Sequence, residues 1–250
     1  MGLHDNRPRD RVVRLLVVGA SGATGRRVVR LMLRHGHHVI AMLRPGATPP
    51  PEQFHPRLTV EYASLLDLGP SQLAGYVRDC DAVVSCLGHT PTFAGIFGQP
   101  RRLVTTATAR LCAAIGQSGQ GQHTRLILMN SAGTLDPGEG EAHTLMERGL
   151  AGALRLLLPP YLDNVTAASY LRNEASRNDA GIEWAVVRPD GLHDGDSAGE
   201  YSVHASPVRS AFFNPGKVSR VNVARFICAL ASDEQAWHRW RRRMPVVYDR

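Results

Sequence analysis

Short apolar runs alternate along the chain with longer stretches in which apolar residues recur at helical spacing. The runs are rich in Val, Ile and Leu and are bounded by polar or Gly-containing segments, so they predict buried strands. We expect strands over Arg14–Val18, His38–Leu43, Leu58–Tyr62, Ala82–Cys86, Arg125–Met129, Glu183–Arg188 and Val246–Tyr248. We expect helices over Gly25–His35, Pro70–Arg78, Arg102–Gln117, His143–Leu158, the segment after Pro160 through Ser176, and Val221–Ser232. This alternation predicts a parallel sheet with helices on both faces, and such sheets bind ligands beyond the carboxyl ends of their strands.

Three glycines connect the first predicted strand to the first predicted helix. Gly19, Gly22 and Gly25 recur at every third position in the sequence GASGATG. The first glycine permits a tight turn, the second lets a pyrophosphate approach the backbone, and the third lets helix and strand pack closely. The spacing is GxxGxxG and differs from the general GxGxxG fingerprint. We predict a phosphate cradle for a nucleotide that is formed by Gly19, Ser21, Gly22, Ala23, Thr24 and Gly25.

The second predicted strand is followed by Arg44, and no carboxylate lies between Val39 and Gly46. A site for NAD usually has Asp or Glu here, which binds the ribose 2′-hydroxyl, whereas Arg pairs with a 2′-phosphate. The cofactor that this position predicts is therefore NADP(H). A surface Arg that merely ends a strand is the alternative interpretation.

The segments after the later strands supply further candidates on the same edge of the sheet. Two leucines offer an apolar wall for adenine, Gly88 lets the backbone pass close to the nicotinamide ribose, and Ser131 faces the same crevice. The turn after the sixth strand borders the nicotinamide carboxamide. The additional cofactor contacts that we predict come from Leu65, Leu66, Leu87, Gly88, Asn130, Ser131, Arg188 and Pro189.

Composition narrows the class of protein. With 250 residues, 43% of them hydrophobic, the chain can bury one sizeable core, so we expect one domain over residues 1–250. The four cysteines lack metal-ligand spacing, which predicts no metal site and the reduced thiols of a cytoplasmic protein. No apolar run is long enough to cross a membrane, and residues 1–11 lack the apolar region of a signal peptide, so we expect no membrane partner. The net charge of +7 suits a phosphate-bearing cofactor, and the arginines are too dispersed to predict a nucleic-acid partner.

Several motifs together resemble a known family. The sequence GASGATG, the strand that ends before Arg44, and the segments VVSCLG, MNSAG and IEWAVVRPDGL look like the atypical short-chain dehydrogenase/reductase group. This group includes NAD(P)H-binding flavin and biliverdin reductase-like proteins and NmrA-like regulators. The resemblance covers about Leu15 to Leu230. It implies an α/β fold, a Rossmann-type doubly wound parallel sheet with a small C-terminal substrate-side region, and NADP(H) as cofactor. The substrate-side elements are expected mainly in residues 89–101, 133–165 and 191–220.

The chain departs from the pattern of classical members, which carry a Tyr and a Lys four residues apart. The Lys lowers the pKa of the Tyr so that the phenol can protonate a carbonyl oxygen. Tyr170 is followed four residues later by Glu174, which has the opposite effect on a phenol. In a second alignment, anchored on Arg188, Thr166 takes the Tyr position and Tyr170 the Lys position, so the pair is absent either way. Ser131 and Tyr170 are the substitute catalytic candidates.

Three functions compete at this point. The first is an NADPH-dependent reductase that transfers hydride to a small, flat, aromatic or conjugated acceptor and needs little acid catalysis. The second is a reductase, isomerase or epimerase with a substituted acid–base residue. The third is a non-catalytic NADP(H)-sensing regulator, as the NmrA-like relatives are thought to be. The expected partner is a small-molecule substrate, and the expected assembly is a monomer or homodimer.

Overall fold

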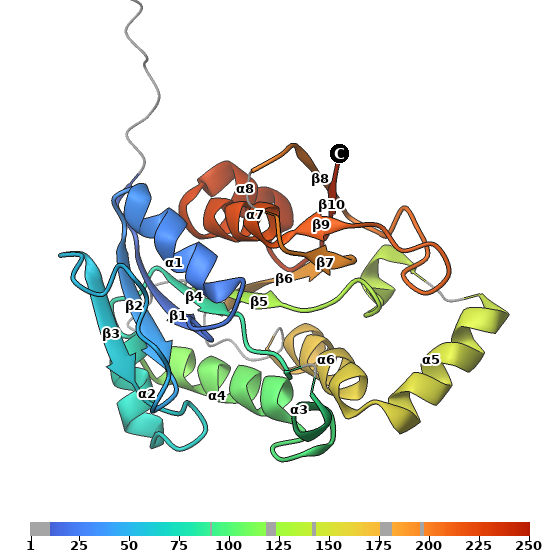
Figure 1. Cartoon of the computed structure of the whole chain (residues 1–250), viewed down its shortest axis with the longest axis horizontal. Coiled ribbons are helices and arrows are strands. Elements are labelled where there is room, and N and C mark those ends of the chain that lie inside the picture. The colour runs from blue at the N-terminus through green and yellow to red at the C-terminus, as the bar shows by residue number, and fades with distance from the viewer. Residues whose placement is uncertain (1–10, 91, 119–123, 142–143, 176–181, 196–197) are drawn as a thin grey trace, which may run out of the picture.

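One sheet organises the chain, and within the described residues its strand order is β3-β2-β1-β4-β5-β6-β10-β8 (Figure 1). The computed structural model describes residues 11–90, 92–118, 124–141, 144–175, 182–195 and 198–250. The strands are β1 (Arg14–Val18), β2 (His38–Leu43), β3 (Leu58–Tyr62), β4 (Ala82–Ser85), β5 (Arg125–Met129), β6 (Glu183–Pro189), β8 (Tyr201–His204) and β10 (Val246–Asp249). All neighbouring pairs are parallel except β10 and β8, which are antiparallel. The order reverses between β1 and β4, so a crevice opens there at the carboxyl ends of the strands.

Helices cover both faces of this sheet (Figure 1). They are α1 (Gly25–Arg34), α2 (Pro70–Val77), α3 (Phe93–Phe97), α4 (Leu103–Ser118), α5 (Leu145–Leu157), α6 (Pro159–Tyr170), α7 (Arg220–Ser232) and α8 (Glu234–Trp240). Helices α1 and α7 pack on one face, and α2, α4 and α6 on the other. The central strands are apolar on both sides because both sides are covered.

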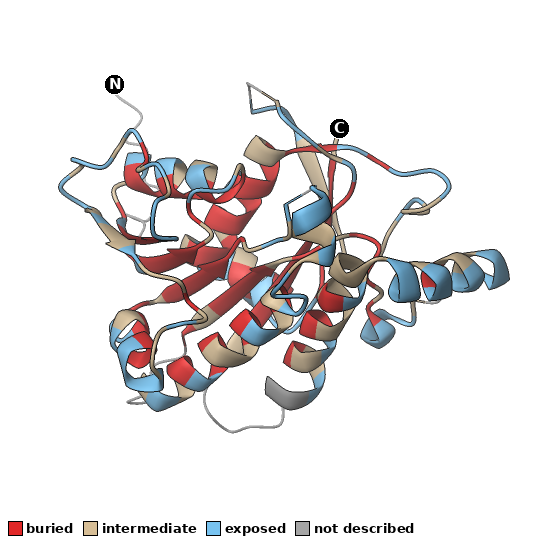
Figure 2. Ribbon diagram, turned by 60° about the horizontal axis from the view of Figure 1, so that its bottom comes forward, coloured by how far each residue is buried: buried red, intermediate tan, exposed pale blue. Residues whose placement is uncertain are grey.

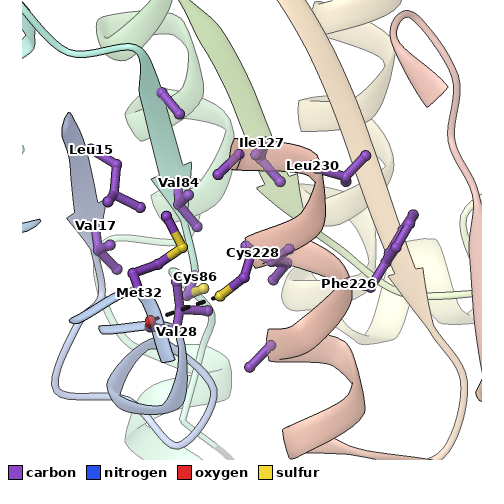
Figure 3. Close-up of a cluster of buried hydrophobic side chains, with 14 of the residues drawn as sticks. Leu15, Val17, Val28, Met32, Val84, Cys86, Ile127, Phe226, Cys228 and Leu230 are labelled. Carbon is purple, nitrogen blue, oxygen red and sulfur yellow. Dashed lines mark hydrogen bonds between the residues drawn. The ribbon is translucent and has the colours of Figure 1, made fainter. Parts of the chain in front are cut away.

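The core therefore consists of two layers, one on each face of the sheet, and the strands appear buried in Figure 2. Figure 3 shows the layer under α1 and α7, to which Val17 of β1, Val28 of α1, Val84 of β4 and Cys228 of α7 all belong. Each strand contributes alternate side chains to the two layers, since successive residues point to opposite faces.

Each predicted strand and helix forms, with small shifts at the ends. Helix α5 begins at Leu145 because Thr144 caps it, and the expected start at His143 lies outside the described residues. Helix α6 ends at Tyr170 and passes into a single π-type segment, Leu171–Ala175, while Ser176 also lies outside them. Residues 1–10 also lie outside the described residues.

Several short elements were not predicted. They are α3, α8, β8, the small parallel pair β7 (Leu192–His193) and β9 (Val218–Ser219), and a 3-10 turn at Pro137–Glu139. Their lengths are too short for a periodic signal, and the strands depend on partners that are distant in sequence.

Two structural findings concern membrane crossing and metal ligands. No helix among the described residues has the length and apolarity for a membrane crossing. No group of three or more His, Cys, Asp or Glu side chains in that part of the chain is placed to hold a metal ion. The four cysteines are free and buried.

Candidate functional site

The turn from β1 to α1 has the geometry that its glycines predict. Gly19 has a φ of 77°, and a Cβ on it would lie 2.9 Å from the backbone carbonyl of Cys86. The Gly22 amide donates to the Gly19 carbonyl at 3.0 Å, and a Cβ on Gly25 would collide with that same carbonyl. No side chain caps α1, and its first turn has no acidic residue, so its N-terminus can attract a phosphate.

A cavity of about 530 Å³ opens beside this turn, at the carboxyl ends of β1, β2 and β4. Eight of the predicted cofactor residues line it, namely Gly19, Ser21, Gly22, Arg44, Leu65, Leu66, Leu87 and Gly88. Asp67, His89 and Gly95 of α3 are also part of the wall. The cavity is large enough for much of a dinucleotide, and its wall combines backbone, apolar surface and one guanidinium.

Arg44 is exposed on this wall, directly after β2. It forms no ion pair among the described residues, so its guanidinium is available to a ligand. Asp67 lines the same cavity from the segment after β3. The glycine turn and Arg44 therefore fit a phosphate-bearing nucleotide. Arg44 stands at the position where a site for NAD usually has Asp or Glu.

The other residues predicted to contact the cofactor do not line this cavity. Thr24 is buried at the start of α1, and the Ala23 carbonyl accepts a hydrogen bond from Arg27 at 2.6 Å. Pro189 is buried and lies opposite Val247 of β10. These residues belong to the turn and to the sheet and are not part of the cavity wall.

Arg188 was predicted to border the cofactor, but the structure gives it another role. Its guanidinium is fully buried and donates to both carboxylate oxygens of Glu141 at 2.7 Å. It also donates to the carbonyls of Thr134 and Ala205 at 2.7 and 3.1 Å. Because these partners come from the segments after β5 and β8, Arg188 holds both segments against β6. No residue spacing indicates this ion pair, since Glu141 lies 47 positions away.

Asn130 also holds two segments together, the loop after β5 and helix α6. Its side-chain oxygen accepts from the Ser131 amide at 2.8 Å and the Thr134 hydroxyl at 2.9 Å. Its amide nitrogen donates to the Asn164 carbonyl in α6 at 2.9 Å. The loop after β5 is thus fixed to α6, and Ser131 is held at the carboxyl end of the strand.

Ser131 lies in a small cluster around Gly133 that the sequence did not reveal. The Gly133 amide donates to Ser131 Oγ at 3.3 Å, and the Tyr161 hydroxyl donates to the Gly133 carbonyl at 3.2 Å. The Tyr161 ring packs against Phe212, with centroids 6.3 Å apart. Burial raises the pKa of the Tyr161 phenol, and the positive charge of Arg155 opposes part of that shift. Tyr161 therefore keeps its proton at neutral pH.

Tyr170 is not part of this cluster. It ends α6, nine residues after Tyr161, which corresponds to about 14 Å along a helix axis. Its side chain packs against the apolar layer under α2, α4 and α6. Because the Tyr161 hydroxyl bonds to the loop that carries Ser131, Tyr161 replaces Tyr170 as the phenol candidate.

His89 lines the cavity, but both nitrogens of its ring are engaged. Nδ1 lies 3.0 Å from the Gly95 carbonyl, and Nε2 lies 2.9 Å from a carboxylate oxygen of Asp163. Asp163 is buried in α6 and also accepts from the backbone amides of Val104 and Thr105 at 2.8 and 2.9 Å, at the start of α4. His89 is thus a fixed part of the wall.

A second cavity of about 450 Å³ lies beside the cluster, between the segment after β5 and the segment after β8. Its wall includes Ala132, Leu135, Arg209 and Phe212. Since Phe212 contacts Tyr161, this cavity adjoins the Ser131–Tyr161 cluster.

Comparisons with known proteins agree with this geometry. A family model described as NAD(P)H-binding matches residues 19–234. A proposed NAD-dependent epimerase/dehydratase from Bacillus halodurans is 21% identical, with a TM-score of 0.68 over 95% of this chain and 94% of that one. A proposed NADH-flavin reductase from Streptococcus pneumoniae is 17% identical, with a TM-score of 0.66 over 95% of this chain and 100% of that one.

A short-chain dehydrogenase/reductase from Veillonella parvula, solved in complex with NADP, is 18% identical, with a TM-score of 0.66 over 95% of this chain and 94% of that one. At these identities the likeness shows the fold alone. No curated protein matches the chain. The family match spans most of the sequence and includes the glycine turn, so the chain belongs to the NAD(P)H-binding family.

Proposed function

We propose that the chain is an NADP(H)-dependent oxidoreductase that transfers hydride to a small, flat or conjugated acceptor. The observation that carries the proposal is the cavity beside the glycine turn, which has Arg44 on its wall beyond β2. A nicotinamide cofactor agrees with the family match, and the preference for NADP(H) rests on Arg44.

In this proposal the two cavities have different roles. Gly19, Ser21 and Gly22 would hold the pyrophosphate, Arg44 the 2′-phosphate, and Leu65 and Leu66 the adenine. When bound, the reduced cofactor supplies a hydride to the acceptor. The second cavity is the place that we assign to the acceptor, because it is partly apolar and adjoins Ser131 and Tyr161.

Reduction of a carbonyl or an enone also consumes one proton. Tyr161 is the candidate donor because it carries a proton at neutral pH and lies at the carboxyl end of β5, while Ser131 is placed to position the acceptor oxygen. The sequence contains a single lysine, Lys217, and Phe213 instead of a tyrosine stands four residues before it, so the Tyr–Lys pair of classical members is absent. An acceptor that is readily reduced suits such a site.

The decisive experiment follows NADPH oxidation by the full chain with a panel of flavin, quinone and enone acceptors. We expect turnover with at least one acceptor. For the enone that turns over, Tyr161→Phe should lower kcat about a hundredfold, whereas the matched variant Tyr170→Phe should leave it unchanged. Equal effects of the two substitutions would remove Tyr161 from the donor role.

Two other functions make different predictions in the same experiment. A sensing protein would turn over no acceptor and would bind NADP+ and NADPH with clearly different affinities. An isomerase or epimerase would interconvert its substrate without net consumption of NADPH. Both alternatives are included because the sequence lacks the Tyr–Lys pair on which classical members depend.

A further inference from the structure

Helix α5 is unusual in how little of it is covered. Its N-terminus is well built, because Thr144 Oγ1 accepts from the Glu147 amide and the Glu147 carboxylate accepts from Thr144 in return. Of its thirteen residues only Ala151 is buried. The helix projects from one end of the molecule and is largely exposed in Figure 2. Tertiary packing therefore does not explain its apolar residues.

The exposed apolar side chains of α5 are large. Leu145 and Leu156 are 84% and 86% exposed, and Met146 and Leu157 are 71% and 67% exposed. Side chains of this kind are usually buried, and a contiguous exposed group of them marks an interaction site.

These side chains share one continuous face. With 3.6 residues per turn, Leu145, Gly149 and Leu156 fall on the side that faces away from Ala151. Met146 and Leu157 continue the apolar surface along one border. A Cβ on Gly149 or Gly152 would meet nothing within 4 Å, so no described part of the chain approaches this face.

The other border of the face is basic. Arg148 and Arg155 fall there, and both residues are exposed. The acidic residue of the helix, Glu147, faces the body instead, where it binds Thr144 and accepts from the Ser210 hydroxyl at 2.6 Å. The apolar strip of α5 is thus bordered on one side by positive charge, while the acidic residue of the helix binds on the side of the body.

A second copy of the chain fits this face poorly. A helix of this length is about 20 Å long and about 10 Å wide, so the face covers roughly 200 Å², against about 800 Å² per partner in a stable protein interface. Two-fold antiparallel pairing would also place Arg148 of one copy beside Arg155 of the other on the same border. A lipid surface needs no shape complementarity and supplies negative charge.

We propose that α5 docks the protein on an anionic lipid surface. Leu145, Met146, Leu156 and Leu157 enter the boundary between head groups and acyl chains, and Arg148 and Arg155 face the lipid phosphates. The helix lies on the membrane and does not cross it, because a crossing needs about 20 apolar residues. The absence of a crossing segment, on which the expectation of no membrane partner rested, does not exclude such a helix.

Co-sedimentation of the full chain with vesicles tests the proposal. One set of vesicles is pure phosphatidylcholine, and the other contains phosphatidylglycerol as well. We expect binding to the anionic vesicles that weakens as salt is raised. Leu156→Gln should weaken it about tenfold, and Arg155→Gln should weaken binding to the anionic vesicles only. The matched control is Phe54→Gln, since Phe54 is 90% exposed in the loop before β3, at the opposite end of the sheet.

The outcomes separate lipid from protein partners. Because the substituted side chains are exposed, circular dichroism and thermal unfolding should not change. Absence of vesicle binding by the wild-type chain, or equal losses in Leu156→Gln and Phe54→Gln, would overturn the proposal. Sedimentation velocity without vesicles measures whether the chain forms a dimer. A dimer that Leu156→Gln converts to a monomer, without vesicle binding by the wild type, would assign the face to a second copy.

Discussion

Arg44 and Arg188 carry the same guanidinium group, and their surroundings give them different roles. Arg44 is exposed on the wall of the larger cavity without an ion pair among the described residues, so its charge is available to a ligand. Arg188 is fully buried and its charge is neutralised by Glu141. A buried charge must be paired where it lies, whereas an exposed one can exchange water for a ligand.

The role of Arg44 leads to a prediction about cofactor selectivity. Arg44→Ala should weaken NADPH binding about tenfold to a hundredfold, because a charge-assisted contact contributes about 1.5 to 3 kcal/mol. NADH binding should change little, since NADH lacks the 2′-phosphate. Calorimetric titration with both cofactors measures the difference. Arg34→Ala, an exposed substitution at the end of α1, controls for net charge, and equal losses for NADPH and NADH in Arg44→Ala would contradict the assignment.

At the scale of elements, α6 joins parts of the molecule that are far apart in sequence. Asp163 binds the first turn of α4 and the ring of His89, and Asn164 accepts from Asn130 at the end of β5. Helix α5, directly before it, buries only Ala151 among its thirteen residues. The two consecutive helices therefore differ in function, since α6 positions the site and α5 presents a surface.

Asp163 should accordingly be important for stability. Asp163→Asn keeps the volume but removes a negative charge and one acceptor at the N-terminus of α4, so we expect a loss of about 2 to 4 kcal/mol in the free energy of unfolding. Urea unfolding measures this loss. Ser219→Ala removes an ordinary cap at α7, where the side chain accepts from the Asn222 amide, and should cost about 1 kcal/mol. Equal losses in the two variants would show that Asp163 is no more than a simple cap.

At the scale of the whole molecule, the two apolar layers hold four thiols. Burial raises the pKa of Cys86 and of Cys112 from the ordinary value of 9.0 to about 12. Burial is also the largest cause at Cys80, whose pKa rises to about 12, and at Cys228, whose pKa rises further. Thiols with such high pKa values are poor nucleophiles, and the core keeps them protonated.

The raised pKa values predict a loss of stability in alkaline solution. The unfolded chain releases these protons near pH 9 and the folded chain only near pH 12, so the stabilisation is complete below pH 9 and declines as pH rises between the two values. Each thiol should contribute roughly 1 kcal/mol per pH unit. Urea unfolding from pH 8 to 11 under reducing conditions measures the slope. Cys112→Ala should reduce the slope by one proton, and an unchanged slope would contradict the prediction.

The sequence was a good guide where structure depends on neighbouring residues. The runs that form β1, β2, β5 and their connecting helices are recognisable because a strand and a helix have different apolar periods. The glycine turn could be placed because its three glycines directly follow the first apolar run at a regular spacing. The extent of the domain, residues 1–250 with substrate-side segments at 89–101, 133–165 and 191–220, stays a prediction, as do the assembly state and a location in the cytoplasm.

Sequence by itself thus determined the order of strands and helices, the glycine turn and the place of Arg44 after β2, because each depends on local spacing. Tertiary structure alone decided the rest of the site. It paired Arg188 with Glu141, placed Tyr161 instead of Tyr170 beside Ser131, and left the apolar face of α5 uncovered. These outcomes depend on which distant segments meet and which side of a helix they cover. The periodicity of a sequence predicts that a helix has an apolar face, but it does not predict which segment or partner covers that face.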